Sequence, residues 1–201
     1  GQGGYDMDRS EFLSELVEVS AKPIFQAKNY WHKSVYDTLE TRKKAAGKIE
    51  NYESTLKAGI VSMKKLWAKH LKMMEKWAQN GKIPGTDEMG KAIENIERES
   101  ETEVSKGRVV FKNGDKLNGD ELDFIERYSS IENLNERIIY MEEDYLYLRI
   151  RDYIILNLYQ FLAQNEEMSN NILKWGAHGS IKELFDLISK YADRCMYTDL
   201  E

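Results

Sequence analysis

Hydrophobic side chains recur at helical spacing over a long part of this chain, from residue 24 to residue 77. The steps between them are three or four residues throughout, which is the spacing of a heptad-like stripe on one helix. The stripe positions are Ile24, Lys28, Trp31, Val35, Leu39, Arg42, Ala46, Ile49, Tyr52, Leu56, Ile60, Met63, Trp67, His70, Met74 and Trp77. The pattern predicts one amphipathic helix over about 24–79. Gly47 and Gly59 are the positions where it would bend, since glycine weakens a helix interior.

A shorter helix is predicted ahead of the stripe, over 9–21. Its apolar face consists of Phe12, Leu13, Leu16 and Val17. Pro23 either opens the next helix at its first turn or kinks one continuous helix. Gly81 suits the left-handed cap that would end the long helix, and another helix is predicted from Thr86 to about Glu103.

Turn-forming residues dominate between about 105 and 118. Asn113 and Gly114 are the pair favoured in a tight hairpin turn, so a small β-hairpin is predicted at about 108–117. Helical spacing then resumes and predicts C-terminal helices over 119–197. Apolar residues occupy nearly every face between Tyr145 and Leu162, which indicates the most buried helix of the protein.

Two details of the C-terminal helices are also predicted. The alternation within Tyr145–Ile150 would suit a strand, but its flanks have helical period, so we favour helix. A break is expected near Asn165, and Ser180 is the predicted cap of the last helix.

Together these elements predict an all-α fold, an elongated helical bundle with one very long amphipathic helix and a small β-hairpin insertion. Residues 1–8 are Gly-rich and are predicted to be disordered. Residues 9–201 are predicted to form a single helical-bundle domain. A helix over 24–79 outruns a compact domain of this size, so part of it should project or pack against several shorter helices.

The composition agrees with this fold. Of 201 residues, 41% are hydrophobic and 32% are charged, and two are proline. Cys195 is the single cysteine, which argues against a disulfide-stapled secreted domain, and we interpret it as a partly buried small side chain. No membrane span is predicted, because the most apolar stretch, 145–162, contains Arg149, Arg151 and Asp152.

Charge is unevenly distributed along the chain. Residues 22–79 contain 13 lysines and arginines against 5 acidic residues, in a chain whose net charge is −6. A basic segment of this kind could bind nucleic acid or a membrane surface. The plainer interpretation is that the basic helix lies against the acidic helices of the same chain, so nucleic acid is not favoured as a partner.

No motif in the sequence predicts chemistry. His32, His70 and His178 have no partner at the spacing of a helical metal site, and His70 is interpreted as a hydrogen-bonded histidine on the stripe. The polar stretch after Asn113 does not fit a calcium loop, and no phosphate-binding glycine loop occurs. We therefore predict that the protein is not an enzyme and has no catalytic residue, metal, cofactor or small-molecule substrate.

Tyrosine is abundant, with 12 copies. Five of them lie within twenty residues: Tyr140, Tyr145, Tyr147, Tyr153 and Tyr159. Ordinary packing in the core and at its boundary is the first interpretation. A protein-binding face is the second, since tyrosine joins an apolar ring to a polar group. The candidate partner contacts are Val110 and Phe111 in the predicted hairpin, with Tyr140 and Tyr147.

One segment resembles a known family. Residues 116–131 read Lys-Leu-Asn-Gly-Asp-Glu-Leu-Asp-Phe-Ile-Glu-Arg-Tyr-Ser-Ser-Ile, which is similar to the middle segment of the TrbJ-like minor pilin-tip proteins of conjugative type IV secretion systems. The layout is also similar, with a long helix, a polar loop and then an acidic helix. The resemblance implies a non-enzymatic protein-interaction component of a bacterial conjugation or secretion apparatus, periplasmic or exported, with no catalytic residues.

Two alternatives remain open. The chain could be a cytoplasmic or phage-type coiled-coil structural or adaptor protein, which would use the long helix as an arm and for self-association. A nucleic-acid-binding protein that uses the basic helix is the third possibility. The chain begins Gly1-Gln2-Gly3-Gly4, and a removed signal peptide would fit this start and would favour export.

Overall fold

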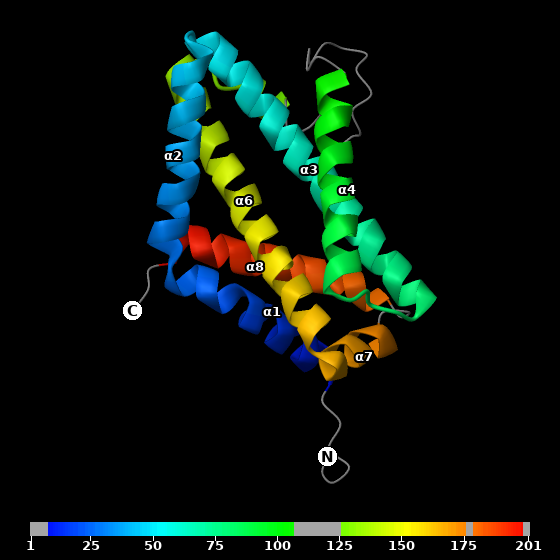
Figure 1. The fold of residues 1–201 in the computed structure, drawn as a ribbon. Helices are drawn as coiled ribbons and strands as arrows, with labels where there is room; N and C mark the ends of the chain where they lie inside the picture. The colour runs from blue at the N-terminus through cyan, green and yellow to red at the C-terminus, as the bar shows by residue number, and fades with distance from the viewer. Residues whose placement is uncertain (1–7, 107–125, 176–178, 199–201) are drawn as a thin grey trace. The chain divides into compact units, whose positions relative to one another are not determined.

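The computed structural model describes residues 8–106, 126–175 and 179–198. Its helices are α1 (Arg9–Gln26), α2 (Lys28–Ala46), α3 (Ile49–Asn80), α4 (Thr86–Lys106), α6 (Leu134–Gln164), α7 (Glu166–Trp175) and α8 (Ile181–Tyr197) (Figure 1). Residues 126–129 are also helical. The described part of the chain is therefore an all-α helical bundle, as the sequence predicted.

The prediction of one very long helix is wrong. The residues assigned to it belong to the end of α1 and to α2 and α3. The first break follows Pro23, which lies inside α1. The N–H of Ala27 bonds to the Pro23 carbonyl at 3.2 Å and caps that helix. The second break is at Gly47, whose φ of 76° lies in the left-handed region, where glycine is strongly favoured.

The hydrophobic stripe nevertheless predicted burial well. Val35, Leu39, Leu56, Ile60 and Met74 are all buried. The half-buried stripe residues are Trp31, Ala46, Ile49, Met63 and Trp67, and Arg42 is exposed. A spacing of three or four residues reports which face of each helix is buried. It cannot report a break of one or two residues between helices, because such a break barely disturbs the spacing.

The predicted hairpin insertion is not supported either. Residues 8–106, 126–175 and 179–198 contain no strand, and the range predicted for the hairpin, 108–117, lies outside them. The fold class as first stated is therefore corrected to an all-α bundle whose longest described helices, α3 and α6, have 32 and 31 residues. The segment predicted to be disordered lies outside the described residues except for residue 8.

The chain divides into two compact units, and each is described by itself. Unit 1 consists of Gly1–Lys28, Lys69–Glu94 and Ile150–Glu201, and unit 2 of Asn29–Ala68 and Asn95–Arg149. The division falls within α3, α4 and α6, so each of these helices contributes residues to both units. The single domain predicted over 9–201 stays a prediction.

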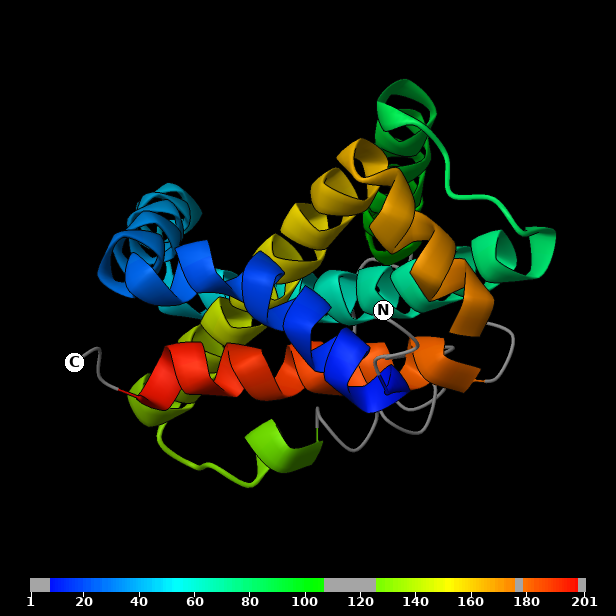
Figure 2. The ribbon, with the colours of Figure 1, turned by 90° about the horizontal axis from the view of Figure 1, so that it is seen from below.

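In unit 1, α1 and α8 lie side by side and run in the same direction (Figure 2). Near their starts, Arg9 and Ser10 both contact the Glu183 carboxylate, at 3.2 and 3.0 Å. Near their ends, the Arg194 guanidinium lies 5.4 Å from the centre of the Phe25 ring. Their buried faces supply much of the core of this unit, through Leu13, Leu16, Val17, Ile24, Leu184, Phe185, Ile188 and Ala192.

Among the described helices, α6 has the largest number of buried residues, most of them in the stretch whose all-round hydrophobicity predicted burial. Its C-terminal half, in unit 1, buries Ile150, Ile154, Ile155, Leu158 and Leu162 almost completely. Helix rather than strand over 145–150 is confirmed, and so is the break at Asn165, whose side chain accepts a hydrogen bond from the Met168 amide. Ser180 does occupy the cap position of α8, but its hydroxyl donates to the Trp175 carbonyl instead of capping the helix.

In unit 2, α3 and α6 run in the same direction and are joined by polar contacts. Arg137 Nε donates to Glu53 at 2.5 Å, and the Tyr52 hydroxyl donates to Glu142 at 2.7 Å. Tyr128, in the short helical stretch 126–129, also contacts α6: its hydroxyl donates to Asp144 at 2.5 Å. These contacts fix the N-terminal half of α6 against its neighbours.

Among the described residues, no helix is long and apolar enough to cross a membrane.

Candidate functional site

A pocket of about 570 Å³ lies in unit 2, among α2, α3, α4 and α6. Its volume is within the range of small-molecule sites in proteins. The lining residues are Arg42, Ala45, Ala46, Thr55, Ala58, Gly59, Ser62, Met63, Glu101, Tyr145 and Arg149. Small side chains thus form much of the wall, while two arginines and several hydroxyl groups supply polar atoms.

Arg42 is an exposed residue whose guanidinium contacts Tyr145. Its Nη1 donates to the Tyr145 hydroxyl at 3.3 Å, and its guanidinium carbon lies 5.8 Å from the centre of the same ring. Tyr145 itself is 5% exposed, so the ring is fixed by the core. A planar guanidinium over an aromatic face is a favourable arrangement that also restricts the arginine side chain.

Gly59 is the reason the ring can lie so close to α3. A Cβ atom at this position would be 3.2 Å from Cε2 of Tyr145 and 3.9 Å from Nη1 of Arg42. The sequence suggested Gly59 as a bend, yet α3 continues through it without a break. The glycine instead allows a close approach of an aromatic side chain to the helix backbone.

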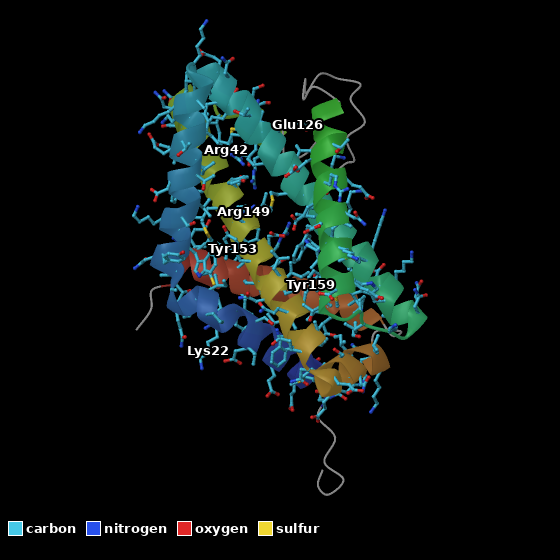
Figure 3. All side chains as sticks on the ribbon, viewed as in Figure 1. Lys22, Arg42, Glu126, Arg149, Tyr153 and Tyr159 are labelled. Carbon is cyan, nitrogen blue, oxygen red and sulfur yellow. The ribbon has the colours of Figure 1, made fainter. Side chains whose placement is uncertain are left out.

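The charged residues of the pocket come from three helices. Arg42 is on α2 and Arg149 is on α6 (Figure 3), and Glu101 is on α4. Two guanidinium groups against one carboxylate give the lining a net charge of +1. Arg149 also has an interaction with another residue of the protein.

This pocket was not predicted from the sequence, although the sequence contains a signal for one of its residues. Three positions of the stripe are not apolar, and each has a specific polar partner. Lys28 donates to the Thr198 carbonyl, and Arg42 donates to the Tyr145 hydroxyl. His70 contacts Tyr159 and Asp152. Lys28 and His70 are buried and Arg42 is exposed, so a polar residue on this stripe marks a specific polar contact but does not predict its burial.

The buried polar cluster of unit 1 consists of His70, Asp152 and Tyr159. The Tyr159 hydroxyl is 2.8 Å from Nδ1 of His70, and Nε2 of the same ring is 3.3 Å from Oδ1 of Asp152. His70 is fully buried and the other two side chains nearly so. This cluster fits the predicted hydrogen-bonded histidine. It contributes to packing in the core rather than to a site that solvent reaches.

Several of the abundant tyrosines are also explained by buried hydroxyl contacts. Burial first, and then the hydrogen bond to Glu142, raises the pKa of Tyr52 well above its usual range. Burial and the hydrogen bond to Asp144 do the same to the pKa of Tyr128. These tyrosines pack in the core with one bonded polar group, which is the first of the two interpretations given above.

The predicted partner contacts lie partly within the described residues. Tyr140 is exposed and Tyr147 is half-buried, and both are on α6. They are seven residues apart, which places them on the same side of the helix two turns apart. Val110 and Phe111 lie outside the described residues, as does His178.

Cys195 is fully buried, where partial burial was expected. Burial raises the pKa of its thiol to about 11, against which Arg194 and Lys28 act in the opposite direction. A protonated, inaccessible thiol is not suited to act as a nucleophile. Within the described part of the chain, no three His, Cys, Asp or Glu residues are grouped so that they could hold a metal ion.

No family model, curated protein or solved structure matches this chain.

Proposed function

We propose that this protein is a non-enzymatic helical-bundle protein that acts through contacts with other proteins. The observation that supports this function is an exposed apolar pair on α6. Ile139 and Tyr140 are each 56% exposed, whereas Ile138 and Met141 beside them are 3% and 0% exposed. Because its neighbours are buried, the pair is held on a fixed helix surface rather than on a loop.

The surface around this pair indicates the chemistry of the partner. We define the α6 face as Glu136, Ile139, Tyr140, Glu143 and Tyr147, which lie on one side of the helix over about three turns. An aromatic and an aliphatic side chain with carboxylates on either side suit a partner that offers an apolar pocket with basic residues at its rim. Tyrosine is enriched among the residues that carry binding energy in such interfaces.

Binding by variants of the α6 face tests this proposal. The wild type and the Tyr140→Ser and Ile139→Ser variants would be used to isolate bound proteins from the source cells under matched conditions. Tyr30→Ser is the control, since Tyr30 is also an exposed tyrosine, at 67%, but lies on α2. We expect both α6 variants to lose the same bound protein, with little change in thermal stability, and the control to keep it.

Two results would count against the α6 face. If the bound proteins are identical for all four proteins, the face is not a contact surface. If Tyr140→Ser lowers the melting temperature strongly, the side chain serves packing instead. Sedimentation of the wild type over a range of concentrations tests whether the partner is a second copy of this chain.

We further propose that the process is bacterial conjugation or secretion, with a periplasmic or exported location. The support is the resemblance of residues 116–131 to the TrbJ-like proteins, of which residues 126–131 are described. A signal peptide in the complete gene and neighbouring genes for a secretion system are the expected findings. A cytosolic start within an unrelated operon would contradict the proposal.

The alternatives lose part of their support. The coiled-coil arm and the self-association through it required a helix over 24–79, and α2 ends at Ala46. The nucleic-acid alternative required the basic residues to lie on that same helix, and they are divided among α1, α2 and α3. Neither is proposed further.

A further inference from the structure

We infer that the pocket among α2, α3, α4 and α6 binds a small carboxylate with an apolar body, and that Arg42 and Arg149 receive the carboxylate group. This inference concerns unit 2 alone and goes beyond the proposed protein contacts. The sequence predicted that the protein has no small-molecule substrate. The pocket is proposed here to bind a small molecule, and no reaction of that molecule is proposed.

The arrangement of Arg42 is the first reason. A guanidinium has five N–H donors in a rigid plane, and the bond to Tyr145 uses one of them. The contacts with Tyr145 favour one position of this exposed side chain before any ligand arrives, which lowers the conformational entropy lost on binding. Carboxylates accept two parallel hydrogen bonds from such a group, which gives both affinity and orientation.

The position of Arg42 is the second reason. It occupies a position of the hydrophobic stripe, yet its side chain turns to the pocket and to Tyr145 instead of to an apolar core. Gly59 provides the space that this arrangement requires, because a side chain there would displace the tyrosine ring and approach the guanidinium. Three separate segments of the chain thus combine to place one cation at the pocket wall.

The charged residues of the lining indicate which class of ligand the pocket suits. The lining has two arginines and one carboxylate, so a small anion suits it better than a cation does. A phosphate near neutral pH has a larger negative charge than a carboxylate and would be repelled more strongly by Glu101. The rest of the wall consists of alanines, Gly59, Met63, Tyr145, Ser62 and Thr55. The Thr55 hydroxyl already donates to backbone carbonyls of its own helix, so much of this wall suits an aliphatic or aromatic body.

Such a carboxylate has two possible sources, a free small acid and the C-terminus of a peptide. Chemical-shift titration of the isotopically labelled full chain can distinguish them. The probes are benzoate and hexanoate as free acids, and the tripeptide Gly-Gly-Phe with a free and with an amidated C-terminus. Benzamide, phenyl phosphate and inorganic phosphate serve as comparisons. We expect at least one free carboxylate to bind with a Kd on the order of 0.1–1 mM, as befits a ligand of this size.

Three variants connect that binding to the pocket. Arg42→Gln removes the cation, and we expect affinity to fall by about 10-fold or more. Ala58→Leu leaves both arginines in place and fills the pocket, and we expect the same loss. Arg98→Gln is the control, since Arg98 is an exposed arginine on α4 that bonds to Asn95 and does not line the pocket. Circular dichroism of each variant confirms that the helices are retained.

The titration results distinguish the two sources of the carboxylate and can also overturn the inference. Tighter binding of the free acids than of the peptide assigns a small-molecule ligand, and the reverse order assigns a C-terminal carboxylate. Failure of all carboxylates to bind, or equal binding of benzamide and benzoate, would overturn the inference. So would unchanged affinity in both Arg42→Gln and Ala58→Leu. Tighter binding of phenyl phosphate than of benzoate would show that the anion is of another class.

Discussion

Gly59 on α3 and Tyr145 on α6 are packed so closely that a methyl group at residue 59 would lie 3.2 Å from the tyrosine ring. The ring cannot easily move away, since it is 5% exposed and its hydroxyl accepts a hydrogen bond from Arg42. One glycine therefore decides both how closely α6 approaches α3 and where the guanidinium of the pocket lies.

Replacement of Gly59 by alanine should destabilise the protein. Alanine favours the helix by up to about 1 kcal/mol, but overpacking against a fixed ring costs about 1–3 kcal/mol. We expect the free energy of unfolding in urea to fall by roughly 1 kcal/mol as the balance of these two effects.

Gly90→Ala is the matched control for that experiment. Gly90 is an exposed glycine within α4, and a Cβ atom there would meet no atom within 4 Å. Only the helix preference then applies, so this variant should be more stable by roughly 0.5–1 kcal/mol. A gain of stability in both variants would show that the tyrosine ring yields readily to the methyl group.

The sequence predicted which side chains are buried better than it predicted how long each helix is. Leu39, Ile60 and Met74 were placed on a buried stripe because apolar spacing reports burial directly. The end of α2 depends on a single left-handed residue, Gly47, and a glycine in a helical pattern is compatible with either a bend or a stop.

The pocket could be predicted only in part. Arg42 interrupts an apolar stripe, and that exception is visible in the sequence. Its partners are not, because Tyr145 and Arg149 follow it by about a hundred residues and reach it only through the packing of α6 in unit 2. No local spacing rule connects positions so far apart, and glycine at residue 59 has no side chain whose type would indicate a contact.

The buried cluster of His70, Asp152 and Tyr159 gives a second prediction. Tyr159→Phe keeps the ring, which packs edge-to-face on Trp77 at 5.7 Å, and removes only the hydroxyl. Nδ1 of the fully buried His70 then loses the Tyr159 hydroxyl as its hydrogen-bond partner. This loss should lower the free energy of unfolding in urea by about 1–3 kcal/mol. Tyr30→Phe, at an exposed tyrosine, should change stability by less than about 0.5 kcal/mol.

A double-mutant cycle with His70→Phe would show whether that cost belongs to the hydrogen bond. If it does, the loss caused by Tyr159→Phe should shrink strongly when His70 is already replaced. Equal losses in the two backgrounds would mean that the hydroxyl stabilises the protein through other neighbours.

The last prediction concerns alkaline pH and Cys195. In the unfolded chain the thiol has an ordinary pKa of 9.0, and burial raises it to about 11 in the folded protein. The folded state therefore keeps its proton over a range of pH in which the unfolded state releases it. The contribution of this thiol to stability is fully present below pH 9, and it is lost as pH rises toward 11. The loss is on the order of 2 kcal/mol over that window.

The wild type and Cys195→Ala should be compared by urea unfolding from about pH 7 to about pH 11. The variant loses some stability at every pH because its core is less well filled, but its curve should fall less steeply above pH 9. The difference between the two proteins is the measurement that matters, because Tyr52, Tyr128 and Tyr159 also have raised pKa values and destabilise both at high pH. Parallel curves would show that the thiol titrates alike in the folded and unfolded chains.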